Sequence, residues 1–112
     1  MLSFQKLDVY RCAIEFLAVA CDLTEQASRG NGPIFDQLRR AATSIPLNIA
    51  EAAGPTGNAD TARCYAIARG SAMECAAILD TLKVLQQADA EYYPRGIELL
   101  ERIVAMLTKL CR

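Results

Sequence analysis

The chain has 112 residues, which predicts a single domain spanning residues 1–112. Its hydrophobic fraction of 53% is rich in alanine and leucine, which favours helices and hints at apolar surface buried between copies of the chain. The 12 basic and 13 acidic side chains leave a net charge of −1, which argues against nucleic-acid binding by bulk electrostatics.

The five cysteines form no CxxC pair, and the chain has no histidine. Zinc sites and redox motifs need closer spacing or histidine partners, so we expect no metal site. We interpret the cysteines as buried reduced thiols that pack as small hydrophobes: Cys12, Cys21, Cys64, Cys75 and Cys111. With no signal-peptide pattern and no apolar run of about 20 residues, the sequence predicts a soluble cytoplasmic protein without a membrane segment.

The first apolar pattern predicts a helix over residues 4–28 with Ser3 as its N-cap. Two neighbouring stripes give this helix a wide apolar surface: Leu7, Tyr10, Ile14, Leu17 and Cys21, then Val9, Ala13, Phe16, Ala20 and Leu23. Such a width is typical of a helix that contacts several neighbours or another subunit.

A second helix is predicted over residues 34–53, after the break RGNGP at residues 29–33. Its stretch QLRRAATSIPLNIAE, residues 37–51, places apolar and polar stripes on different sides. The apolar stripe is Leu38, Ala42, Ile45 and Ile49, and the polar stripe is Gln37, Arg40, Ser44, Asn48 and Glu51. Pro46 removes a backbone hydrogen bond, which predicts a bend. Serine and asparagine are poor helix formers, so their positions within this helix predict partners for their side chains.

The sequence GPTGN at residues 54–58 predicts a short turn that reverses the chain before a third helix over residues 59–87. Asp89 is predicted to cap a fourth helix over residues 91–110, with Pro94 in its first turn. Four helices joined by short links predict an all-α, antiparallel up-down-up-down four-helix bundle.

Folding the third helix back on the second predicts contacts between their polar side chains. Turn geometry gives these pairs: Arg40 with Glu74, Glu51 with Arg63, Ser44 with Arg69, and Asn48 with Cys64 and Tyr65.

No group of residues is typical of catalysis. Without histidine, a general base would have to be a group such as Glu51 or Glu74, and each of these has an arginine within predicted reach. A neighbouring arginine lowers the pKa of a carboxyl group, which suits an ion pair better than a base. The sequence also lacks a P-loop and a paired-carboxylate metal motif. We therefore expect no enzymatic activity, no cofactor and no small-molecule substrate.

The polar side chains of the second and third helices have two open interpretations. In one, ion pairs between Arg40 and Glu74 and between Glu51 and Arg63 fix the register of helices within or between subunits. In the other, four arginines line a groove that holds the phosphates of a nucleic acid: Arg39, Arg40, Arg63 and Arg69. A protein partner is a further alternative.

Three stretches resemble the four-helix-bundle proteins encoded within 23S rRNA intervening sequences: FQKLDVYRCAIEFLAVACDLTE (4–25), QLRRAATSIPLNIAE (37–51) and YAIARGSAMECAAILD (65–80). The accessory variability protein of diversity-generating retroelements is a relative of that family. The resemblance implies a homo-oligomeric ring, commonly a pentamer. For the retroelement relative it also implies work with a reverse transcriptase and RNA contact through a basic ring surface. Here Ala52 and Pro55 replace a glycine and a basic residue of the family pattern.

Two functions are consistent with these observations. The first is a non-enzymatic, self-assembling cytoplasmic scaffold or adaptor. The alternative is a ring that binds RNA or another nucleic acid through arginines of the second and third helices, as a partner of a reverse transcriptase or of ribosomal RNA.

Overall fold

The computed structural model describes residues 1–26, 32–54 and 57–111. Within these ranges the chain forms a short 3-10 helix, η1 (Ser3–Lys6), and four α-helices, α1 (Asp8–Glu25), α2 (Gly32–Ala52), α3 (Asn58–Val84) and α4 (Tyr92–Leu110). The predicted all-α class with four helices is confirmed.

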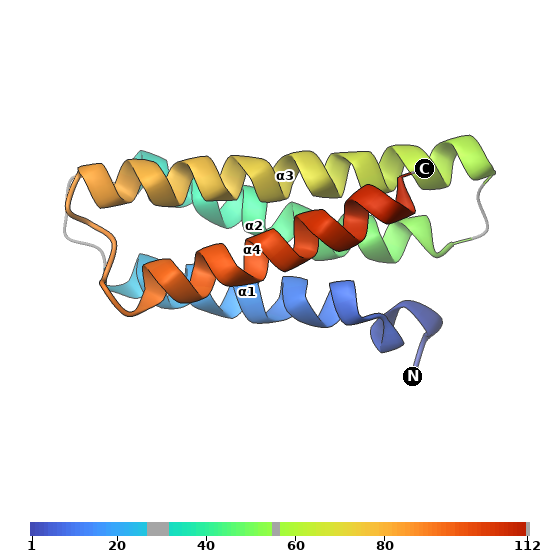
Figure 1. Ribbon diagram of the computed structural model, residues 1–112, viewed down its shortest axis with the longest axis horizontal. Helices are drawn as coiled ribbons and strands as arrows, with labels where there is room; N and C mark the ends of the chain where they lie inside the picture. The colour runs from blue at the N-terminus through green and yellow to red at the C-terminus, as the bar shows by residue number, and fades with distance from the viewer. Residues whose placement is uncertain (27–31, 55–56, 112) are drawn as a thin grey trace.

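The four α-helices lie along the long axis of a molecule that measures 44 × 22 × 21 Å (Figure 1). Both α1 and α3 pack against α2 and α4, so α1 lies diagonally across from α3, and α2 lies diagonally across from α4. In Figure 1 consecutive helices run in opposite directions.

The beginning of α1 differs from the prediction. Ser3 is part of η1, and Leu7 has an extended backbone (φ −74°, ψ 133°) that separates η1 from α1. The aromatic side chains of Phe4 and Tyr10 pack edge to face across this junction, with ring centroids 5.0 Å apart. The first residues therefore form a separate turn, and α1 begins at Asp8, where an acidic side chain suits a helix N-terminus.

The second helix begins close to its predicted position. Gly32 and Pro33 form the start of α2, and Pro33 loses no hydrogen bond there because the first helical amides have no partner within the helix. The helix continues through Pro46, which is buried, and ends at Ala52. The predicted end of the first helix at Ser28, residues 29–31 of the predicted break and residues 55–56 of the predicted turn lie outside the described residues.

The end of α3 depends on a left-handed residue. Gln86 has a φ of 59°. The Gln87 amide donates to the Leu82 carbonyl at 2.8 Å, and the Gln86 amide donates to the Lys83 carbonyl at 3.1 Å. This pair of bonds is a Schellman motif, which usually has glycine at its left-handed position. Because Gln86 stands there instead, the sequence pattern predicted too long a helix, and α3 ends at Val84.

A turn held by Asp89 precedes α4. The Glu91 amide donates to Asp89 Oδ1 at 2.8 Å. Asp89 was predicted to be the N-cap of the fourth helix, but the N-cap of α4 is Glu91, so Asp89 caps a turn that ends two residues later. At the start of α4 the Tyr93 hydroxyl donates to Asp80 Oδ1 at 2.6 Å, and Lys83 Nζ lies 4.5 Å from the centroid of the Tyr93 ring. The hydrogen bond to Asp80 raises the pKa of Tyr93. These contacts attach α4 to the last turns of α3.

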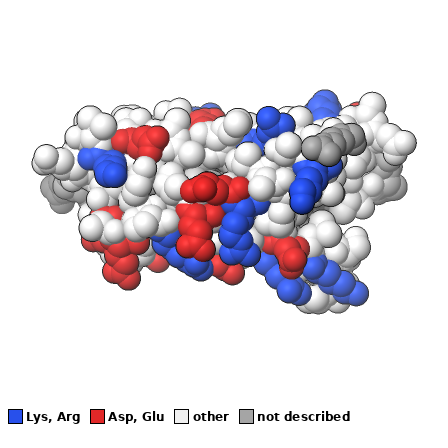
Figure 2. Space-filling view, in the orientation of Figure 1, with Lys and Arg blue, Asp and Glu red and all other residues white. Residues whose placement is uncertain are grey.

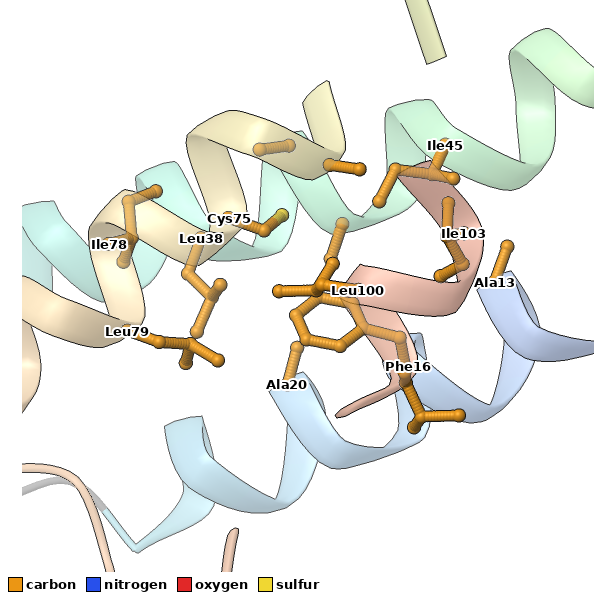
Figure 3. Packing of buried hydrophobic residues seen from close by; sticks show 14 of the residues in the cluster. Ala13, Phe16, Ala20, Leu38, Ile45, Cys75, Ile78, Leu79, Leu100 and Ile103 are labelled. Atoms are coloured by element: carbon orange, nitrogen blue, oxygen red, sulfur yellow. The ribbon is translucent and has the colours of Figure 1, made fainter. Parts of the chain in front are cut away.

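Small residues let the helices approach one another around one large aromatic side chain. Figure 3 shows the Phe16 ring of α1 reaching into the space between the helices, close to Leu100 of α4. At Gly96 of α4, an added Cβ atom would lie only 2.9 Å from Leu79 Cδ1 of α3, so any larger residue there would force the Leu79 side chain to shift. Five alanines are fully buried at 0% exposure: Ala13, Ala20, Ala42, Ala68 and Ala72.

Replacing Gln86 with glycine should stabilise the protein. The left-handed conformation costs a non-glycine residue roughly 1 kcal/mol, and glycine adopts it without that cost. We expect Gln86→Gly to raise the free energy of unfolding by about 1 kcal/mol, measured by urea denaturation with circular dichroism as the probe.

Val84→Gly is the matched control, because Val84 is 83% exposed and lies in the last helical turn rather than in the left-handed position. Glycine there should lower stability by about 0.5 kcal/mol through its poorer helix propensity. A loss of stability in Gln86→Gly equal to that of the control would contradict the assignment of the motif.

Candidate functional site

The side of α2 that faces away from the core forms an open groove of about 790 Å³, which we call the α2 groove. All of its lining residues come from this one helix: Asp36, Arg39, Arg40, Thr43, Ser44, Leu47, Asn48 and Glu51. Five of the eight predicted site residues are therefore brought together: Arg39, Arg40, Ser44, Asn48 and Glu51. They meet because positions three and four apart share a helix face, while residues such as Ile45 and Ile49 occupy the buried side.

Ser44 joins α2 to α3 at the edge of this groove. The Ser71 hydroxyl of α3 donates to Ser44 Oγ at 2.9 Å. The Asn48 amide group donates to Ser44 Oγ at 3.1 Å and to the Ser44 carbonyl at 2.9 Å. The expectation that serine and asparagine have partners is confirmed, but the partner of Ser44 on α3 is Ser71 and not Arg69, because the chain reverses slightly later than the turn geometry assumed.

Arg40 and Glu74 do not form the predicted ion pair. Both line a second, smaller groove at the edge of α2, but the Gln37 side-chain amide donates to Glu74 Oε2 at 3.1 Å in place of Arg40. Within the described part of the chain, neither Arg39 nor Arg40 has a carboxylate within ion-pair distance, and both side chains are exposed. The guanidinium groups of these two residues therefore face solvent.

The predicted pair of Glu51 with Arg63 is also wrong. Arg63 Nε lies 3.9 Å from Asp60 Oδ1 of its own helix, with both side chains exposed. Arg69 is partly buried, and neither Arg63 nor Arg69 lines the α2 groove. Positions 63 and 69 point to different sides of a helix with 3.6 residues per turn, so the four arginines do not share one groove.

The α2 groove is electrically balanced. Its two arginines, Arg39 and Arg40, are accompanied by two carboxylates, Asp36 and Glu51. Figure 2 shows basic and acidic side chains interspersed on the face where α3 and α4 lie in front. The α2 groove, with charges of both signs, therefore differs from the single-sign basic patches that are typical of phosphate-backbone binding.

The thiols have the environment of core residues rather than of reactive groups. All five cysteines are free; Cys12, Cys64 and Cys75 are buried, and Cys21 and Cys111 are partly buried. Burial raises the pKa of Cys75 to about 12 and also raises the pKa of Cys12, so both remain protonated thiols near neutral pH. Among residues 1–26, 32–54 and 57–111, no group of three or more histidine, cysteine or acidic side chains could hold a metal ion.

No helix in the described part of the chain is long and apolar enough to cross a membrane.

An apolar groove between α3 and α4 was missed by the sequence analysis. This α3/α4 groove has a volume of about 370 Å³, and Met73 beside it is 52% exposed. Its lining residues are apolar except for Glu101: Met73, Ala76, Ile97, Leu100, Glu101, Val104 and Ala105. Met73 lies off the buried side of α3, which carries Ala72 and Cys75, and that displacement was the available signal. On α2, Leu47 stands outside the predicted apolar stripe in the same way, and it is 62% exposed.

These features define an all-α helical protein with a polar groove on its second helix and an apolar groove between its last two helices. A family model described as "23S rRNA-intervening sequence protein" matches residues 5–109. The chain belongs to this family, as the resemblance of its three stretches implied.

A solved structure supports the fold. It is a protein of unknown function from the S23 ribosomal protein family of Bacteroides thetaiotaomicron, with a TM-score of 0.83 at 24% sequence identity over 92% of this chain and 94% of that chain. No match was found among curated proteins.

The hydrogen bond between Ser44 and Ser71 should stabilise the contact of α2 with α3. In a double-mutant cycle of Ser44→Ala and Ser71→Ala, we expect a coupling energy of about 0.5–1.5 kcal/mol in urea denaturation. Thr81→Ala is the control, because the Thr81 hydroxyl donates to the Ala77 carbonyl of its own helix at 2.8 Å. Additive effects of the two serine substitutions would show that this hydrogen bond does not set the register.

Proposed function

We propose that this protein is a non-enzymatic, self-assembling cytoplasmic scaffold or adaptor, an up-down-up-down four-helix bundle whose copies associate into a ring, with a pentamer favoured. The α3/α4 groove carries this proposal. It leaves Met73 half in water beside a surface that is apolar except for Glu101. Contiguous exposed apolar surface is typical of protein interaction sites, and covering it gains roughly 25 cal/mol for each Å² removed from water.

Two further points support association between copies. The α2 groove combines charges of both signs with the exposed Leu47, a composition that suits contact with a protein surface. The resemblance of the chain's three stretches to the 23S rRNA intervening sequence proteins also implies a homo-oligomeric ring.

Solution mass tests the proposal. We expect light scattering to give about five times the chain mass of 12.2 kDa, unchanged by a short structured RNA. The mass should also stay constant between about 50 and 200 mM salt, because apolar burial depends little on ionic strength. A mass of one chain at micromolar concentration would refute self-assembly.

RNA binding is the second candidate, and one observation favours it: Arg39 and Arg40 are exposed without an ion pair in the described part of the chain. Two such guanidinium groups in each subunit, repeated around a ring, would bind phosphates with avidity. The balanced charge of the α2 groove places this candidate second.

The arginine pair can be tested directly. If RNA binds there, Arg39→Ala with Arg40→Ala should weaken binding and reduce the slope of log K against log salt by about 2, one for each lost phosphate contact. Arg11→Ala with Arg63→Ala removes the same charge from exposed positions outside the α2 groove and should leave the slope unchanged. Equal losses in the two double variants, in a filter-binding titration, would argue against a site on α2.

A further inference from the structure

We propose that the outward face of α2, centred on Leu47, docks into the α3/α4 groove of a second copy of this chain. This inference rests on the proposed self-assembly and adds which two surfaces meet.

Leu47 is the apolar member of an otherwise polar face. Its neighbours along the outward side of α2 are Arg40, Thr43 and Glu51, at spacings of three and four residues. Leu47 is nevertheless 62% exposed, which leaves most of a large apolar side chain in water. Among the described residues of a single copy no contact removes this cost, whereas an apolar recess on another copy would.

The α3/α4 groove is such a recess. It contains small side chains, Ala76 and Ala105, between larger apolar ones, so a branched side chain can enter between the two helices. Leu100, at its base, is already 2% exposed and belongs to the core. A leucine placed in the groove would therefore extend the core of one copy with a side chain of the next.

The charges around the two surfaces are complementary. Arg39 and Arg40 lie about two turns before Leu47 on α2 and have no carboxylate partner in the described part of their own chain. Glu101 is the charged residue that lines the α3/α4 groove, and it is exposed. Docking brings an unpaired guanidinium pair towards this carboxylate, which favours this partner surface over a second α2 groove, where arginines would meet arginines.

The two surfaces can be used by one copy at the same time. The α3/α4 groove lies on the side of α3 and α4, and α2 is diagonally across from α4. Each copy thus presents the leucine on one side and the recess on another. Such a contact is heterologous, and it generates a ring when the rotation between successive copies closes.

Mixing two damaged copies tests the pairing. Leu47→Glu removes the docking side chain, and Met73→Glu places a charge beside the recess; both positions are more than half exposed, so the helices should form normally. Alone, each variant should fall to the mass of one chain, 12.2 kDa, in light scattering. Mixed in equal amounts they should form a dimer, because the intact Leu47 of one variant can enter the intact groove of the other.

Val84→Glu, at an 83% exposed position outside both surfaces, is the control and should keep the wild-type mass. Circular dichroism checks folding, and Ala105→Glu, exposed at the same groove, replaces Met73→Glu if that variant unfolds. A wild-type oligomer that survives Leu47→Glu, or a mixture that stays monomeric, would overturn the pairing while leaving self-assembly intact. A monomeric wild-type protein would refute self-assembly itself.

Discussion

The close approach of α2 and α3 determines which side chains of α2 point away from the core. Fully buried Ala42, Ala68 and Ala72 leave little side-chain volume between the helices, and the Ser71 hydroxyl bonds to Ser44 at 2.9 Å beside them. No buried side-chain nitrogen or oxygen in the described ranges lacks a partner. Because this contact sets the rotation of α2, it also decides that Leu47 and the neighbouring arginines point away from the core.

The charged side chains that join helices differ from those that are exposed on α2 for contacts with other molecules. In the described ranges, the ion pair between two helices is the 2.7 Å contact of Arg95 on α4 with Glu15 on α1, and it is exposed. Exposed pairs contribute little to stability, generally below about 1 kcal/mol. The bundle is consequently held by apolar packing around Phe16. Arg39 and Arg40 have no ion pair in the described part of the chain and are exposed, so they are available for contacts with other molecules.

Membership of the 23S rRNA-intervening sequence protein family explains the fold better than it explains the activity. A solved structure with 24% identity has the same fold at a TM-score of 0.83, which agrees with the tolerance of cores to substitutions that preserve volume and pattern. Function depends on surfaces placed on such a fold. In this chain those surfaces are the α2 groove and the α3/α4 groove, both formed by outward positions that the core does not constrain.

The sequence by itself determined the four helices, the apolar side of the first two and the cluster on α2, because helical periodicity is local and needs no partner. It also placed Pro33 at a helix start, although it misjudged Ser3 and set the N-cap of α4 at Asp89 instead of Glu91. Tertiary structure alone decided the contacts between elements. The sequence predicted that Gln86 is helical, but its backbone is left-handed. Arg40 and Glu74 do not form the predicted ion pair, because Gln37 donates to Glu74 instead. The α3/α4 groove is formed by residues that are distant in the chain. Such features depend on the register and rotation of one helix relative to another. A displacement of half a turn changes both, and the local sequence of a single helix does not encode them.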